Sequence, residues 1–293
     1  MFFLRLLSRL PFPVLYAFSD FLFFISFYLV RYRRKMVQKN LSHSFPEKSQ
    51  PELRAIEKEF YRNLCDYGVE MLKLFTISKD ELAKRMVFQH QEVPERYKQQ
   101  NQPILFLASH QFNWEWLLVS ASISFPMAIE FVYQPVNNKF FDAFSLLSRS
   151  RFGALAIKRD EVAREIIKRR NQLRGIASVA DQYPGYGHDK KYITTFLNQE
   201  TVFFYGTNQL AIMTQYPVLY YEIKKVKRGY YIASPVVVGE PPYEKTSDKV
   251  IERYVRSVEK NIRENPSSWL WSHNRWKKRH LEQVHDMRNQ ASI

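Results

Sequence analysis

A short apolar run that leads straight into a polar turn and a helix constrains this chain more than any other feature. Residues 103–108 read PILFLA, which predicts a buried strand. Residues 109–115 read SHQFNWE, so His110 follows the end of that strand, and a helix is predicted from Asn113 to about Ser124. Binding and catalytic groups in open α/β sheets gather at the carboxyl ends of strands. The sequence therefore predicts an α/β fold with a site beside His110.

The same alternation of strands and helices continues along the chain. Strands are predicted at 103–108, 127–133, 155–158, 175–180, 217–224 and 229–238. Helices are predicted at 51–74, 113–124, 138–151, 160–173, 201–214, 245–264 and 269–278, with one or two more within 78–98 and a loop at 183–191. This order is typical of a layered sheet flanked by helices. With no internal repeat and no long linker, residues 36–293 are predicted to form a single domain.

The first 35 residues differ from the rest and are predicted to form a membrane anchor. Residues 14–30 are almost wholly apolar, and a basic cluster at 31–35 follows at once. A helix of this length rises roughly 25 Å, a little less than the ~30 Å hydrocarbon core. The helix can therefore span the bilayer with help from snorkelling arginines, or lie in the interface; a buried core helix is the alternative. The basic cluster favours a cytoplasmic location for the following domain.

Composition limits the classes of function. The 44 Lys and Arg against 29 Asp and Glu give a net charge of +15, which fits an anionic membrane face, an acidic protein, a phosphorylated substrate or nucleic acid. Glycine-rich phosphate loops, GxSxG and HExxH are absent, and Cys65 is the only cysteine. No disulfide can form within the chain, and no metal site is predicted. A generally basic surface with no single partner is the alternative explanation of the charge.

His110 is the candidate general base. Residues five apart on one helix lie roughly 140° apart, so Glu115 reaches His110 only if His110 lies in the turn and Glu115 in the first helical turn. Glu115 would then accept a proton from one ring nitrogen and raise the basicity of the other. That second nitrogen would deprotonate a substrate hydroxyl. The ordinary explanation of an isolated histidine is a structural one.

Further polar residues fall at predicted strand ends and in the aromatic, basic tail. They are Gln134, Arg149, Arg151, Asp181, Gln182, His273 and Arg275. Arginine is suited to holding phosphate or an oxyanion. Solvation, capping or core packing would explain each one singly, so their convergence at one sheet edge is a prediction about the fold.

Together these residues resemble the late acyltransferases of lipid A biosynthesis, the lauroyl/myristoyl transferase family, over nearly the whole chain. The matching segments are His110-x4-Glu115 with Asn113-Trp114-Glu115, residues 34–47, Tyr133-Gln134-Pro135 with Asn137-Asn138, Arg149 with Arg151, Asp181-Gln182, and the tail from Trp269 to Lys277. Two elements depart from the family pattern. Gln134 replaces a frequent arginine, and residues 195–198 read TFLN in place of Pro-Phe-Phe-Gly. Both departures lie where substrate contacts are expected.

The resemblance implies a glycerolipid-acyltransferase-like fold and a membrane-anchored O-acyltransferase on the cytoplasmic face of the inner membrane. It implies transfer of an acyl chain from acyl carrier protein to a hydroxyl of a lipid A precursor, with no cofactor, no metal and no nucleic acid. His110 and Glu115 would form the base dyad, and Arg149 or Arg151 would stabilise the oxyanion or hold phosphate. The residues expected to bind substrate are Asn113, Gln134, Asp181, Gln182, His273 and Arg275. The alternatives are an acyltransferase for another bacterial glycolipid or aminolipid, or a non-enzymatic protein that binds anionic lipid or nucleic acid.

Overall fold

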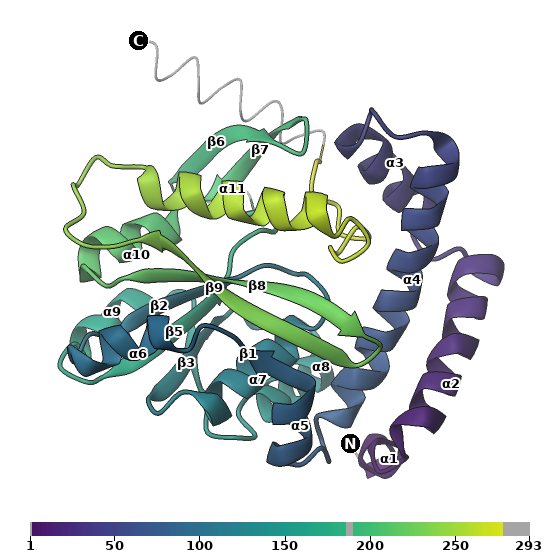
Figure 1. Ribbon diagram of the computed structural model, residues 1–293, viewed down its shortest axis with the longest axis horizontal. Coiled ribbons are helices and arrows are strands. Elements are labelled where there is room, and N and C mark those ends of the chain that lie inside the picture. The colour runs from purple at the N-terminus through teal and green to yellow at the C-terminus, as the bar shows by residue number, and fades with distance from the viewer. Residues whose placement is uncertain (1, 186–189, 278–293) are drawn as a thin grey trace.

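A seven-stranded sheet forms the centre of the computed structural model, which describes residues 2–185 and 190–277 (Figure 1). Its strands are β1 (Met86–Phe88), β2 (Ile104–Ala108), β3 (Ala128–Tyr133), β4 (Leu155–Lys158), β5 (Arg174–Val179), β8 (Val218–Lys227) and β9 (Tyr230–Gly239). They are arranged in the order β1-β9-β8-β2-β5-β3-β4. Strands β8, β2, β5, β3 and β4 run parallel, whereas β9 runs antiparallel to β8 and β1 runs with β9. A separate hairpin pairs β6 (Lys191–Phe196) with β7 (Gln199–Phe204).

Helices cover both faces of this sheet. They are α1 (Phe2–Ser8), α2 (Phe12–Phe24) with a π-helical turn η1 (Ile25–Leu29), α3 (Arg34–Ser44), α4 (Gln50–Lys73), α5 (Lys79–Arg85), α6 (Glu92–Gln99), α7 (Trp114–Ser124), α8 (Lys139–Arg149), α9 (Val162–Lys168), α10 (Gly206–Thr214) and α11 (Lys249–Glu264). Successive residues of β2 point to opposite faces, as in any strand. Leu105 and Leu107 pack in the cluster that contains α11, while Ile104 and Phe106 pack in the cluster that contains α5 and α7. This two-sided burial explains why β2 is apolar throughout.

The layered α/β fold predicted from the sequence is confirmed, and most predicted elements appear within a few residues of their expected bounds. Two predicted helices are wrong. Residues 201–214 begin as strand β7 and become helical only at α10, because the run Thr201-Val202-Phe203-Phe204 alternates between the two faces of the hairpin. Residues 269–277 form turns rather than a helix, and Trp269 bridges to Gln111. Residues 78–98 also contain a strand, β1, between their two helices.

The N-terminal helices lie along α4 (Figure 1). Within the described residues, Phe12–Leu29 is long and apolar enough to cross a membrane, by length and composition alone. Polar contacts nevertheless tie α2 to the body of the protein. The Ser19 hydroxyl donates to Asp66 at 2.7 Å, and Asp20 pairs with Arg228 at 2.7 Å. The division into an anchor at 1–35 and a domain at 36–293 stays a prediction.

Candidate active site

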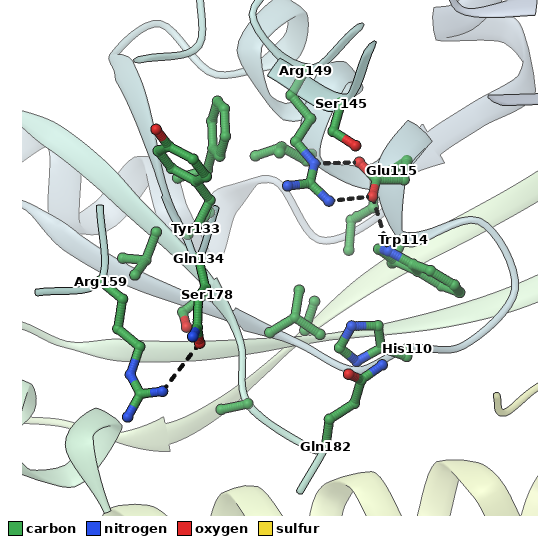
Figure 2. Close-up of a pocket in the computed structure, with 18 of the residues that line it drawn as sticks. His110, Trp114, Glu115, Tyr133, Gln134, Ser145, Arg149, Arg159, Ser178 and Gln182 are labelled. Carbon is green, nitrogen blue, oxygen red and sulfur yellow. Dashed lines mark hydrogen bonds and ion pairs between the residues drawn. The ribbon is translucent and has the colours of Figure 1, made fainter. Parts of the chain in front are cut away.

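A deep cavity opens where three neighbouring parallel strands end. In the sheet order, β5 lies between β2 and β3, so the carboxyl ends of all three meet at one edge. The cavity has a volume of about 680 Å³. Five of the residues predicted for the site line it: His110, Glu115, Gln134, Arg149 and Gln182 (Figure 2). The structure thus brings together groups that are up to 72 positions apart in the chain, from 110 to 182.

His110 is held by Asp181. The imidazole Nδ1 lies 2.6 Å from Asp181 Oδ1, and the His110 backbone N–H donates to both carboxylate oxygens at 3.1 and 3.2 Å. Trp269 Nε1 donates to Asp181 Oδ2 at 2.6 Å, and the Asp181 side chain is fully buried. Burial alone would raise the pKa of this carboxyl, but the nearby His110 and the hydrogen bonds lower the pKa below its ordinary value. Because Nδ1 is engaged, Nε2 is the His110 nitrogen available to a substrate.

Glu115 makes a different contact from the one expected. It lies in the first turn of α7, but its carboxylate faces α8 and not His110. Arg149 donates to it through Nε at 2.7 Å and through Nη2 at 2.6 Å, and Trp114 Nε1 donates at 3.1 Å. Burial would lower the pKa of Arg149, but Glu115 raises it above its ordinary value. The expected contact between His110 and Glu115 is therefore replaced by two pairs, His110 with Asp181 and Glu115 with Arg149.

The Glu115 pair fixes the direction of the arginine. A bidentate contact orients the planar guanidinium more strongly than a single hydrogen bond does. Figure 2 shows the third nitrogen of Arg149, Nη1, pointing into the cavity. The side chain of Arg149 is 25 % exposed, so this cation is accessible to a ligand.

Contacts on the side away from the cavity hold the turn between His110 and α7. Phe112 has a φ of 44°, in the left-handed region that a bulky side chain rarely adopts. Asn113 caps α7 by accepting from Trp116 N at 2.9 Å and donates from Nδ2 to the buried Glu70 at 2.7 Å. Burial raises the pKa of Glu70 to about 7, although hydrogen bonds from Asn113 and Tyr231 counteract it. Asn113 is thus placed in the support of the turn and not in the cavity wall.

Three other predicted residues lie outside the cavity lining. Arg275 is fully buried behind Asp181, where its Nε donates to the Asp181 carbonyl at 2.9 Å. Burial and the neighbouring Arg275 together lower the pKa of His273 to about 4. Arg151 donates to the Leu74 carbonyl and stacks on Phe152. These three side chains support the protein around the site instead of facing a ligand there.

The sequence did not identify the inner wall of the cavity. Its apolar lining includes Phe88, Phe106, Leu117, Ala121, Phe125 and Tyr221. The wall follows α7 from Glu115 to the cap at Phe125, ten residues or about 15 Å along the helix axis. Near the mouth, Arg159 donates to Gln134 Oε1 at 3.2 Å, and it was also missed because it lies in a loop without a recognisable motif. A long apolar ligand with a reactive polar end fits this shape.

Among the residues that the structure describes, no cluster of three or more His, Cys, Asp or Glu side chains could hold a metal ion.

A family model described as bacterial lipid A biosynthesis acyltransferase matches residues 1–278. A comparison with curated proteins found no match.

Proposed function

The chain belongs to the bacterial lipid A biosynthesis acyltransferase family, and we propose that it transfers a fatty acyl chain from acyl carrier protein to a hydroxyl of a lipid A precursor. One observation carries this proposal. A histidine fixed through Nδ1 by a buried carboxylate stands at the polar end of a long apolar cavity. The cavity suits an acyl chain, and the histidine suits removal of a hydroxyl proton beside the thioester.

In the proposed reaction, His110 Nε2 accepts the proton as the acceptor oxygen attacks the thioester carbonyl. Asp181 stabilises the imidazolium that forms, because it is a charged acceptor at Nδ1. The tetrahedral intermediate then collapses, the carbon–sulfur bond breaks, and His110 returns the proton to the sulfur. The products are an ester and the free thiol of the carrier.

Arg149 is proposed to stabilise negative charge at the reacting centre, either the oxyanion or an acceptor phosphate. Its Nη1 points into the cavity while Glu115 holds the other two nitrogens. A fixed donor aimed at developing charge is typically worth ~3 kcal/mol in the transition state. Glu115 would therefore act through Arg149, and Asp181 would take the role that the spacing assigned to Glu115.

The net charge of the chain and its N-terminal helices are compatible with the proposed partners. The net charge of +15 suits an acidic carrier protein and phosphorylated lipid heads. Helices α1 and α2 are proposed to hold the enzyme on the cytoplasmic face of the inner membrane. Gln134 stands at the cavity mouth where the family often has arginine, so a glycolipid other than the standard precursor is the alternative acceptor.

The test is an acyl-transfer assay with full-length protein in detergent. Acyl-carrier-protein thioesters of several lengths and a panel of lipid acceptors are supplied, and products are identified by mass spectrometry beside His110→Ala. A mass gain on a lipid A precursor that disappears in the variant is the expected result. Transfer only to another lipid would replace the proposed acceptor. No transfer by folded protein with intact thioester, or full activity in His110→Ala, would refute the proposal.

A further inference from the structure

Helix α8 has its polar and apolar faces reversed. Helices on the surface of a soluble domain turn apolar side chains toward the core and polar ones toward water. In α8 the polar side chains Asp142, Ser145 and Arg149 line the cavity, beside a single apolar one, Leu146. Phe141 and Leu147 face outward instead, with 59 % and 48 % of their surface exposed. Phe140, with 42 % exposed, lies on the same outer side. This apolar face requires a partner other than water.

The C-terminal end of α4 joins α8 to the N-terminal helices. On one side, the Phe75 ring packs edge-on against Phe144 of α8, with centroids 5.0 Å apart. On the other side, Lys73 Nζ donates to the carbonyls of Ser8 and Leu10, which end and follow α1, at 2.9 and 2.8 Å. Figure 1 shows α1 and α8 near the same end of α4. Helices α1 and α8 therefore both lie at the C-terminal end of α4.

The outer face of α1 is apolar as well. Phe3, Leu6 and Leu7 are 76 %, 53 % and 45 % exposed. Further exposed apolar side chains continue the surface along α2. They are Val14, Phe18, Phe21 and Phe24. A surface of this extent is characteristic of contact with a membrane or with a large apolar partner.

The charges at the border of this surface are positive except on α2, where the Asp20 side chain is 59 % exposed and pairs with Arg228 at 2.7 Å. Arg5 and Arg9 are exposed near α1, and Lys139 is exposed at the start of α8. Across residues 2–13 and 134–151 the only acidic side chain is Asp142. That carboxylate lines the cavity and accepts from Val136 N at 3.0 Å. An apolar face with a basic border is complementary to anionic phospholipid.

We propose that the outer face of α8, formed by Phe140, Phe141 and Leu147, inserts into an anionic bilayer surface together with α1 and α2. The opposite side of α8 is the wall of the cavity, so the membrane would lie one helix diameter from Arg149. A lipid acceptor could then reach His110 from the bilayer without crossing water. This consequence for the acceptor rests on the proposed function, whereas the membrane contact itself does not.

The contact is tested by a spin label at Phe141→Cys on the full-length chain. Cys65 is buried and does not compete for the label. The protein is bound to vesicles of phosphatidylethanolamine and phosphatidylglycerol, and collisions of the label with oxygen and with a water-soluble nickel complex are compared. A label at Gln99→Cys, exposed on α6, is the control. We expect the label at 141 to be reached by oxygen and shielded from nickel, with the reverse at 99. Equal nickel access at both positions would overturn the proposal, and so would shielding of position 141 in the absence of lipid, which would indicate a protein partner.

Kinetics provide a second readout. The double variant Phe141→Ser with Leu147→Ser removes apolar surface without touching the cavity, and Met213→Ser on α10 removes a side chain that is 43 % exposed elsewhere. We expect the double variant to transfer acyl chains to a vesicle-embedded acceptor about tenfold more slowly, with transfer in detergent nearly unchanged. Met213→Ser should match the parent in both assays. A shielded label without any acyl transfer would refute the proposed function alone, whereas normal transfer with an exposed label would refute the membrane contact alone.

Discussion

Replacing Asp181 by asparagine should invert the tautomer of His110. Trp269 Nε1 is only a donor and lies 2.6 Å from Asp181 Oδ2, so the amide oxygen of the variant must face Trp269. Its NH2 group then occupies the place of Oδ1, 2.6 Å from His110 Nδ1. Nδ1 becomes the acceptor, and the proton moves to Nε2. The nitrogen that should remove the hydroxyl proton is thereby blocked.

The expected loss follows from the two effects together. General-base catalysis is worth about 100-fold to 10,000-fold, and the imidazolium also loses its buried counter-charge. We expect kcat to fall about 1,000-fold, which corresponds to about 4 kcal/mol. Single-turnover acyl transfer measures this, and circular dichroism checks that the fold is retained. More than a tenth of the parent rate would refute the reasoning.

A second substitution isolates the tautomer. Trp269→Phe in the Asp181→Asn background removes the donor that fixes the amide, so the amide oxygen can turn toward His110 Nδ1. The backbone N–H of His110 lies within 3.2 Å of both Asp181 oxygens, so it can donate to the amide oxygen in either orientation of the amide. We expect the double variant to recover about tenfold over Asp181→Asn alone. If it is no faster, the tautomer explanation is wrong.

Three further outcomes follow from the structure. Glu115→Gln should slow transfer about 10-fold to 100-fold without shifting the pH–rate profile, because Glu115 contacts Arg149 and not His110. A shifted profile would contradict this and indicate that Glu115 acts directly on His110. Ala121→Leu should shift donor preference toward shorter acyl chains by about tenfold per excluded methylene. Competition between thioesters of different length measures this preference, and an unchanged preference would contradict the prediction. Burial raises the pKa of Glu70 from 4.5 to about 7, so its contribution to stability is present below about pH 4.5 and lost as the pH rises through 7. The free energy of unfolding of Glu70→Gln should therefore fall less between pH 5 and 8 than that of the parent, by up to about 3 kcal/mol, and parallel curves would count against it.

Local sequence signals predicted strand β2 and the starts of helices α4 and α8. Strand β2 is buried on both faces, so its apolar run is unambiguous. Helix α4 begins with the Ser49–Glu52 capping box, and Asn138 caps α8, so the sequence marks both starts. The segment 201–204 forms a strand by pairing with residues 191–196, and this pairing cannot be read from the local sequence. The tail at 269–277 owes its shape to Trp269 and Arg275, which are buried against Asp181.

The site was predictable to the level of the sheet edge and no further. Topology alone places His110, Gln134 and Gln182 beside one another once β2, β3 and β5 are recognised as neighbours. Which carboxylate meets which partner depends on side-chain directions across 71 positions of the chain for Asp181 with His110, and across 34 positions for Arg149 with Glu115. A five-residue spacing carries no information about either.

Asp181 and Glu115 contact different partners because different parts of the fold hold them. Asp181 lies at the edge of the sheet. Trp269 and Arg275 of the C-terminal tail hold it there, so it presents a fixed hydrogen-bond acceptor to His110. Glu115 lies on helix α7 and holds the guanidinium of Arg149, which lies on helix α8. Helix α8 is also the element whose outer face is apolar, so any movement of that helix at a membrane would displace Arg149 while leaving His110 and Asp181 in place. If both proposals hold, proton transfer takes place at the sheet edge, and charge stabilisation comes from the helix that contacts the lipid.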